Sequence, residues 1–241
     1  MQATSDEVYK QTNNALYNEQ GNIWRDENEC LHLLKSSVNP ARVGYFRRLL
    51  DQVFKFDFRG AAALDVGCGG GILAEEFAGM GFRVTGIDPS EQSLHAARKH
   101  AQSMELSIQY QEGTGESIPF ADNTYPVVYC CDVLEHVRDL PKVISEIYRV
   151  TKPGGVFFFD TLNRTFVSKL VAIKVWQESK STAFMPAAAT RVENVYPAGR
   201  TKRIACAGRI RVQGISWHIA GRKHRQDDQP AAEESERQNR L

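Results

Sequence analysis

A glycine-rich turn between two carboxylates is the first feature of this 241-residue sequence that could bind a reactive small molecule. The segment LDVGCGGG, residues 64–71, joins a predicted buried strand to a predicted helix. Glycines such as Gly67 and Gly69 let the backbone turn tightly and approach a ligand closely. Asp65 precedes these glycines, and Asp88 follows the next predicted strand. The pattern therefore predicts a nucleotide-type cofactor site, although a glycine run can also be a loop of structural convenience.

The charge of Asp65 indicates which cofactor this turn favours. A pyrophosphate at the N-terminus of the following helix would be repelled by a carboxylate, whereas an amino group and a sulfonium would be attracted to it. Asp88 lies 21 positions after Gly67, where an acid can accept hydrogen bonds from both hydroxyls of a ribose. The glycine pattern is GxGGG rather than GxGxxG. The residues therefore favour S-adenosylmethionine over a nicotinamide dinucleotide.

A second group of titratable residues, Asp132, Glu135 and His136, follows another predicted buried strand. An imidazole can exchange a proton near neutral pH, so His136 is a candidate general base. Alternatively, the three residues, spaced i, i+3 and i+4, could converge on one side of a helical turn and bind a divalent ion such as Mg²⁺ that acidifies an acceptor hydroxyl. In a third interpretation, Glu135 and His136 only fix the conformation of a loop.

Alternating strands and helices are expected to position both groups. The sequence predicts helices at residues 40–52, 72–80, 90–104 and 140–150, and strands at residues 61–66, 82–87, 106–110, 127–131 and 156–159. A turn is expected at residues 152–155. This alternation indicates an α/β fold with a doubly wound, mostly parallel sheet. Ligands of such sheets bind at the carboxyl ends of the strands, where both groups of residues lie.

Overall composition excludes several other classes of protein. The 30 Lys+Arg and 29 Asp+Glu give a net charge of +1, which provides no global field for a nucleic-acid partner. No apolar run approaches the roughly 20 residues that cross a bilayer. The first twenty residues lack a secretory signal, and the five cysteines contain no CxxC pair, so a reducing, cytoplasmic location is expected.

The composition changes abruptly near residue 187. All 12 Phe and 14 of the 15 Leu lie in residues 1–186, whereas residues 187–240 contain neither type. Residues 187–241 carry 11 Lys+Arg and 6 Asp+Glu, a net charge of +5, against −4 for the rest. Such a segment could be a disordered basic tail, or a tail that binds RNA or acidic lipid.

Several segments together resemble a known family. LDVGCGGG, VTGIDPS, GESIPF and TKPGG resemble the Rossmann-like class I S-adenosylmethionine-dependent methyltransferases. Within that class, NPARVGYF at 39–46, CDVLEHV at 131–137 and TLNRT at 161–165 resemble the ubiquinone-biosynthesis O-methyltransferases, which methylate phenolic hydroxyls of polyprenylated catechols. The resemblance spans roughly residues 16–186.

The resemblance implies roles for individual residues. Arg42 would contact the carboxylate region of the cofactor, Gly67 would face it with its backbone, and Asp88 would bind the ribose. Glu116 and Cys131 would lie near the adenine. Read without the resemblance, Arg42 could equally be a solvated helix charge and Glu116 an ordinary loop carboxylate. Quinone-pathway relatives have acid, acid and His at positions 132, 135 and 136 with a magnesium-type ion.

A shifted reading frame would explain the change of composition near residue 187. With permitted synonymous codons, Val192–Ile204 read from the second base gives WKMFIRPEELKE, a phrase typical of the family. We therefore expect residues 1–38 to be a helical or irregular N-terminal segment and residues 39–186 to be the cofactor-binding domain. Residues 187–241 would be a disordered or out-of-frame tail, so that the sheet lacks its last strands.

The function expected from the resemblance is S-adenosylmethionine-dependent O-methylation of a polyprenylated phenol or catechol in ubiquinone biosynthesis. The alternatives are another small-molecule methyltransferase and a truncated, inactive cofactor-binding remnant. Residues 166–176 are predicted to form a basic amphipathic helix, which could rest on the inner membrane or could be packed core or a lid. The sequence does not determine the oligomeric state.

Overall fold

The computed structural model describes residues 38–134, 136–162 and 211–217. Within these residues one sheet contains six strands in the order β3-β2-β1-β4-β5-β6, and all neighbouring strands are parallel. The strands are β1 (Ala62–Val66), β2 (Arg83–Asp88), β3 (Gln109–Glu112), β4 (Tyr125–Cys130), β5 (Thr151–Leu162) and β6 (Arg211–Trp217). The chain order reverses between β1 and β4, which is the position where doubly wound sheets bind ligands. The predicted fold class is confirmed.

Two of the helices, α4 and α5, begin at residues whose side chains cap them. They are α2 (Asn39–Arg48), which continues as a π-helical turn η2 (Leu49–Val53), α3 (Ile72–Gly79), α4 (Glu91–Ser103) and α5 (Leu140–Val150). The Ser90 hydroxyl accepts a hydrogen bond from the Ser93 N–H at 3.2 Å at the start of α4. Asp139 accepts one from the Lys142 N–H at 3.0 Å at the start of α5. Each bond satisfies a helix N–H that has no partner within the helix.

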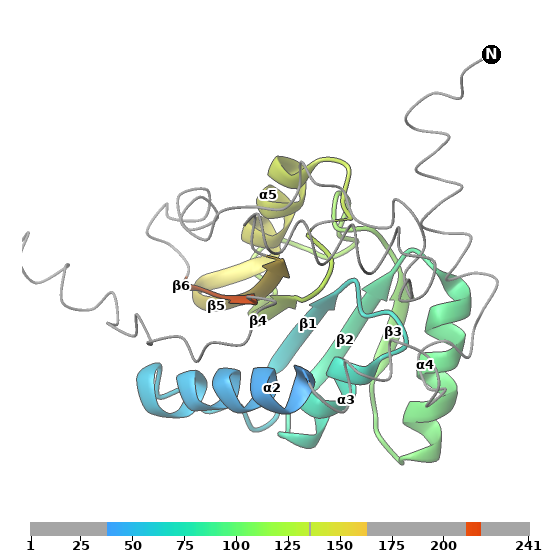
Figure 1. Ribbon diagram of the computed structural model, residues 1–241, viewed down its shortest axis with the longest axis horizontal. Coiled ribbons are helices and arrows are strands. Elements are labelled where there is room, and N and C mark those ends of the chain that lie inside the picture. Colours follow the sequence, from blue (N-terminus) through green and yellow to red (C-terminus); the bar gives the residue numbers. More distant parts are fainter. Residues whose placement is uncertain (1–37, 135, 163–210, 218–241) are drawn as a thin grey trace, which may run out of the picture.

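The helices cover both faces of the sheet, with α2, α3 and α4 on one side and α5 on the other (Figure 1). Alternating residues of β5 point to opposite faces, so Phe157 and Phe159 pack in the core beneath α5 and Phe158 packs in the core beneath α2 and α3. Phe46 of α2 stacks on Phe158 with ring centroids 4.4 Å apart. This contact fixes α2 above the end of β5.

Two elements differ from their predicted form. Strand β3 begins at Gln109 rather than at residue 106. Strand β5 runs through the predicted turn at 152–155, because the pairing with β4 shifts there: Thr151 lies opposite Tyr125, but Val156 lies opposite Val127. Gly154, with φ of 75°, allows the extra residues to bulge out of the sheet.

Strand β6 belongs to the segment interpreted as a disordered or out-of-frame tail. The structure places Arg211–Trp217 at the edge of the sheet, with Val156 of β5 opposite Arg211 and Leu162 opposite Trp217. A strand therefore follows β5 in this stretch, and the interpretation of residues 187–241 as a disordered or out-of-frame tail stays a prediction. The N-terminal segment up to residue 37, the predicted helix at 166–176 and the rest of the tail lie outside the described residues, so the domain boundaries stay predictions.

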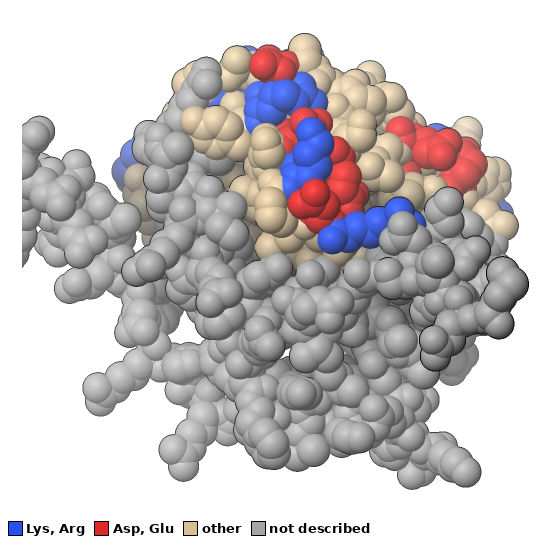
Figure 2. All heavy atoms as spheres, turned by 90° about the horizontal axis from the view of Figure 1, so that it is seen from above, with Lys and Arg blue, Asp and Glu red and all other residues tan. Residues whose placement is uncertain are grey.

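The surface carries charges of both signs. Figure 2 shows Lys and Arg side chains interspersed with Asp and Glu side chains on one face of the molecule. This mixture agrees with the balanced composition. No helix within the described residues is long and apolar enough to cross a membrane.

Candidate functional site

The glycine turn is held by the end of strand β2. The N–H groups of Gly67 and Cys68 donate to the carbonyl oxygen of Ile87 at 2.8 and 2.9 Å, and the Gly69 N–H donates to Asp88 Oδ2 at 2.9 Å. A phosphate-binding turn points its N–H groups at the anion. Because these three N–H groups are already bonded to protein oxygens, the turn is poorly suited to a pyrophosphate.

Gly67 shows why this turn requires glycine. Its φ is 78°, in the left-handed region where a side chain is strained. A Cβ at this position would also overlap the side chain of Val133, from the segment after β4. The absence of a side chain lets the turn after β1 lie against the segment after β4, which brings the two predicted groups of functional residues together.

Asp65 lies inside β1 and is 2% exposed. Its Oδ2 atom is buried and has no hydrogen-bond partner among the described residues. Burial raises the pKa of Asp65 well above its usual value and nearby Asp88 raises it further, whereas Arg42 and the neighbouring Tyr129 hydroxyl oppose the shift. By distance and angle, the buried Tyr129 hydroxyl makes no hydrogen bond within the described residues. The simple expectation of a permanently charged Asp65 is therefore incomplete, because a buried carboxyl in this setting is held towards its neutral form until a cation approaches.

Asp88 ends β2 and links the glycine turn to α4. Its Oδ2 accepts from the Gly69 N–H and its Oδ1 accepts from the Ser90 N–H, each at 2.9 Å. Burial raises the pKa of Asp88, and the two N–H donors oppose that shift. Each carboxylate oxygen can accept more than one hydrogen bond, so Asp88 can hold the turn and still accept from ribose hydroxyls.

Arg42 is 2% exposed, and the interpretation of this residue as a solvated helix charge is wrong. Its Nη1 donates to Asn39 Oδ1 at 2.9 Å, and its Nη2 lies 2.7 Å from Asp132 Oδ2 and 2.5 Å from Asp160 Oδ2. Burial acts to lower the pKa of Arg42, but Asp132 and Asp160 outweigh it and raise the pKa. The buried face of α2 therefore contains Asn39 and Arg42 as well as Phe46.

Asp160 is a residue of this site that the sequence analysis missed. It is fully buried near the end of β5, and its Oδ1 accepts the Asp132 N–H at 2.8 Å. Asp160 lies two residues after Phe158, and Arg42 lies one helical turn before Phe46, so the stacked rings bring the two charges together. An acid directly after the apolar run at residues 156–159, at the ligand-binding end of a strand, was the available signal.

Cys131 lies beside this ion cluster. It is 9% exposed, and burial and then Asp160 raise the pKa of its thiol, while Arg42 opposes them. The structure therefore groups Cys131 with Arg42 and Asp160. The predicted position of Cys131 near an adenine stays a prediction.

The turn after β4 carries the predicted catalytic and metal-binding residues. The N–H of His136, which is half-buried, donates to the Val133 carbonyl at 2.8 Å and closes a single turn. Asp132 has φ of 56°, in the left-handed region, so it does not share a helical face with His136. Glu135 lies outside the described residues. Among the residues that are described, no group of three potential metal ligands was found.

Glu116 lies in the connection between β3 and β4. Its Oε1 accepts the Arg138 N–H at 3.0 Å, which joins this connection to the segment before α5. The predicted adenine contact of Glu116 is not tested by this arrangement, and it stays a prediction.

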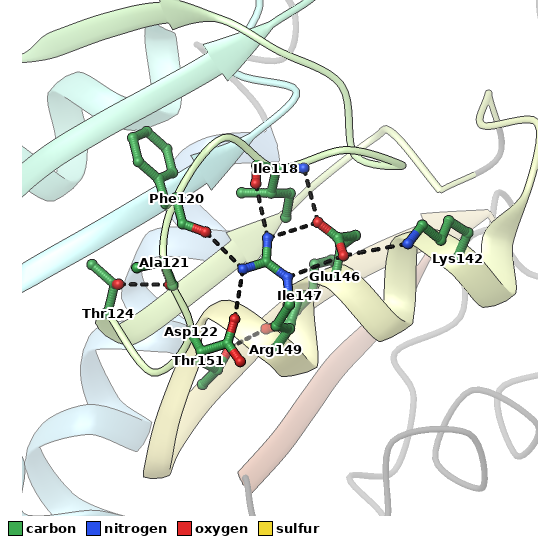
Figure 3. Close-up of polar contacts among 10 residues, drawn as sticks. All are labelled: Ile118, Phe120, Ala121, Asp122, Thr124, Lys142, Glu146, Ile147, Arg149 and Thr151. Carbon is green, nitrogen blue, oxygen red and sulfur yellow. Dashed lines mark hydrogen bonds and ion pairs between the residues drawn. The ribbon is translucent and has the colours of Figure 1, made fainter.

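Arg149 of α5 also holds the connection between β3 and β4, and Figure 3 shows its contacts. Its guanidinium donates to the carbonyl oxygens of Ile118 at 2.9 Å and Phe120 at 2.7 Å, and to Asp122 Oδ1 at 2.9 Å. It also donates to both carboxylate oxygens of Glu146, at 3.1 and 2.8 Å. All five N–H groups of an arginine are thereby used.

Comparisons with known proteins agree with this geometry. A family model described as "Methyltransferase domain" matches residues 64–159, from β1 to β5. The chain is 40% identical over 151 residues to a ubiquinone biosynthesis O-methyltransferase of Alkalilimnicola ehrlichii, a match that covers 62% of this chain and 58% of that protein. It is 33% identical over 177 residues to the protein of the same name from Rhizobium etli, with 70% and 71% covered.

The chain matches only part of the length of these relatives, and one solved structure has a similar fold. The chain spans 58% of the A. ehrlichii protein and 71% of the R. etli protein. Among solved structures, the YcgJ protein from Bacillus subtilis is similar with a TM-score of 0.53 at 20% identity, over 68% of this chain and 66% of that chain. That likeness concerns the fold alone.

Proposed function

We propose that this chain, which belongs to the ubiquinone-biosynthesis O-methyltransferases within the class I S-adenosylmethionine-dependent methyltransferases, transfers a methyl group to a phenolic oxygen of a polyprenylated catechol. The observation that carries the proposal is the buried, unpartnered Oδ2 of Asp65 beneath a glycine turn whose N–H groups face the protein. A buried acceptor without a donor fits a cationic ligand, and a turn with few available N–H groups does not fit a phosphate.

The residues of the site fit S-adenosylmethionine. Asp65 would accept from the amino group of the cofactor, Arg42 would face its carboxylate, and Asp88 would accept from its ribose. Gly67 and Gly69 would let the backbone approach it, and both have positive φ. When bound, S-adenosylmethionine supplies a methyl group on a positively charged sulfur.

The chemical role of the chain is to align the acceptor and to remove its proton. Methyl transfer is an in-line displacement, so holding the acceptor oxygen opposite the leaving sulfur supplies much of the rate. His136 would take the proton of the phenolic hydroxyl, because it follows β4 at the end of the sheet where Asp65 and Gly67 also lie. Glu135 would assist His136 as the second predicted catalytic residue.

A magnesium ion does not fit the described arrangement of Asp132. Oδ2 of Asp132 is bound to the Arg42 guanidinium at 2.7 Å, and a divalent ion at that carboxylate would be repelled by this buried positive charge. We therefore derive no catalytic step through a metal. The sequence-based set of Asp132, Glu135 and His136 is tested by assaying transfer with and without Mg²⁺.

The setting proposed for the enzyme is the cytoplasmic side of the inner membrane, where a polyprenylated substrate would be found. The cofactor-binding domain would comprise residues 39–186. The basic amphipathic pattern at residues 166–176 supports a peripheral contact, because such helices bury their apolar face at a lipid surface.

A second candidate function is a cofactor-binding remnant without transferase activity. The observation that favours it is the absence of Phe and Leu from residues 187–240, together with a matched length of 58% in the A. ehrlichii relative. Such a chain would bind S-adenosylmethionine but would transfer no methyl group. The nucleotide sequence across codons 180–200 tests the shifted-frame explanation directly.

Calorimetric titration with S-adenosylmethionine, followed by transfer of a radiolabelled methyl group to a catechol, tests the proposal. We expect S-adenosylmethionine to bind, NAD to bind at least about tenfold more weakly, and label to appear in the catechol. Binding without transfer would favour the remnant. A preference for NAD would contradict both candidates.

A further inference from the structure

We propose that Asp160 is a positioning residue that holds Arg42 and the turn after β4 where they receive the amino-acid end of the methyl donor. This inference rests on the proposed function and adds to it a residue that neither the sequence analysis nor the comparisons assign. Asp160 would act through its two neighbours rather than by touching the ligand.

The two oxygens of Asp160 have separate tasks. Oδ1 accepts the Asp132 N–H at 2.8 Å, and Oδ2 lies 2.5 Å from Arg42 Nη2. Asp160 therefore joins α2, the segment after β4 and the end of β5 at one point. Its own exposure is 0%, so it cannot present its carboxylate to a ligand at the surface.

The backbone of Asp132 needs such an anchor. Its φ of 56° lies in the left-handed region, which is unfavourable for a residue other than glycine. The bond from its N–H to a fully buried carboxylate compensates for this strain. The direction of the chain towards Val133 and His136 is thus set at Asp160.

The ion cluster of Arg42, Asp132 and Asp160 is not explained by its contribution to the free energy of unfolding alone. One guanidinium faces two carboxylates, and buried ion pairs often add little to the free energy of unfolding because both charges lose their hydration. Arg42 Nε is buried and has no hydrogen-bond partner among the described residues. Asp65 Oδ2 is likewise buried and without a hydrogen-bond partner among the described residues, and Asp65 lies opposite Tyr129 of β4, two residues before Cys131.

An unused donor and an unused acceptor at the same end of the sheet match a ligand that carries a carboxylate and an ammonium group. The amino-acid end of S-adenosylmethionine has both groups. Asp160 and Asp132 take the two N–H groups of Arg42 Nη2, and Asn39 takes one of the two on Nη1. Nε and the second N–H of Nη1 remain as donors, and Asp160 determines their position. Loss of Asp160 should therefore weaken recognition of that end of the ligand and spare the adenosine end.

Two ligands that differ only at that end provide the test. S-adenosylhomocysteine carries the amino-acid group, and 5′-methylthioadenosine lacks it. We expect Asp160→Asn to weaken binding of S-adenosylhomocysteine by about tenfold or more, as loss of a charged hydrogen bond does, and to change binding of 5′-methylthioadenosine by less than about twofold. Calorimetric titration of the full chain measures both affinities.

Three control variants accompany this measurement. Glu146→Gln removes a buried carboxylate on the opposite face of the sheet, and it should leave both affinities unchanged. Asp160→Ser keeps an acceptor for the Asp132 N–H and provides the same comparison if Asp160→Asn does not fold. In an Arg42→Met background, Asp160→Asn should change the affinity for S-adenosylhomocysteine by less than about twofold, because Asp160 acts through Arg42.

Each other outcome would overturn the inference. Equal weakening of both ligands would make Asp160 a residue of general stability, and unchanged binding of S-adenosylhomocysteine by a folded variant would remove its role. A tenfold effect that persists in the Arg42→Met background would show that Asp160 acts by another route. If the wild-type chain binds neither ligand, the proposed function itself is contradicted. The results for the variants bear only on the role of Asp160.

Discussion

Two arginines, one on each side of the sheet, differ in how fully their hydrogen-bond donors are used. Arg149, on the α5 side, makes five hydrogen bonds with its five N–H groups, and its side chain is 30% exposed (Figure 3). Arg42, on the buried face of α2, has a side chain that is 3% exposed, and its Nε has no hydrogen-bond partner among the described residues. Both arginines pair with two carboxylates.

This difference indicates that the Arg149 network has a structural role, whereas the Arg42 cluster is suited to bind a ligand. The Arg149 network satisfies the carbonyl oxygens of the connection between β3 and β4, so it has no need of a further group. The Arg42 cluster is more deeply buried, yet it keeps an unused donor, and Asp65 keeps an unused acceptor. Such atoms are costly in a folded protein unless a ligand satisfies them.

The largest expected effect is the loss of folding stability when the buried charge of Arg42 is removed. Arg42→Met leaves Asp160 buried without its cation, and we expect the free energy of unfolding to fall by about 3–5 kcal/mol. Arg149→Met should cost less, about 1–3 kcal/mol, because the Arg149 side chain is 30% exposed and its partner Asp122 is 67% exposed, so water replaces part of the network. Urea denaturation of the two variants measures the difference. A greater loss for Arg149→Met would reverse the comparison.

The second prediction concerns Glu146, the acid that Arg149 binds with both oxygens. The hydrogen bond from Arg149 lowers the pKa of Glu146 from 4.5 to about 2. A lowered pKa in the folded state stabilises the protein above pH 4.5, and this contribution is lost as the pH falls from 4.5 towards about 2. Glu146→Gln should therefore lower the free energy of unfolding at pH 7 by about 1–3 kcal/mol, with a smaller difference in acid.

Thermal unfolding of wild type and Glu146→Gln from neutral pH down to about pH 2 measures this effect. Asp57→Asn, which changes an exposed acid, is the matched control and should stay within about 0.5 kcal/mol of wild type throughout. A difference for Glu146→Gln that is constant with pH would mean that the Arg149 network does not act through its charge.

The third prediction separates binding from stability at Asp65. Because burial raises the pKa of Asp65 above 3.8, its charge opposes folding as the pH rises through that value. Asp65→Asn should therefore leave the free energy of unfolding at pH 7 unchanged or raise it by up to about 1 kcal/mol, while affinity for S-adenosylmethionine falls by about tenfold. Calorimetry and urea denaturation of one preparation test both parts. Unchanged affinity would refute the idea that Asp65 recognises a cation.

The smallest effect is expected at Glu116, which lies on the connection that Arg149 secures. In Glu116→Gln the side-chain carbonyl still accepts the Arg138 N–H, so the free energy of unfolding should change by less than about 0.5 kcal/mol. Glu116→Ala removes the acceptor and should cost about 1 kcal/mol. Equal losses in these two variants, measured by urea denaturation, would show that charge rather than the hydrogen bond matters there.

Much of the scaffold could be predicted from the sequence because it depends on local patterns. The alternation of apolar strands and helices indicated the parallel sheet, and Ser90 indicated the start of α4. The left-handed backbone at Gly67 follows from a glycine turn. The path of β5 through Gly154 was not predicted, because a bulge depends on register with β4 rather than on residue type alone.

The sequence by itself determined which residues lie at or just beyond the carboxyl ends of the strands, and so placed Asp65, Asp88 and His136 at the same end of the sheet. Only the tertiary structure decided how those residues are paired. Arg42 and Asp132 are 90 positions apart, and they meet because Phe46 stacks on Phe158 and fixes α2 over β5. Local periodicity carries no information on such contacts, because charge pairing across elements depends on the order of the strands and on the packing of a helix against them.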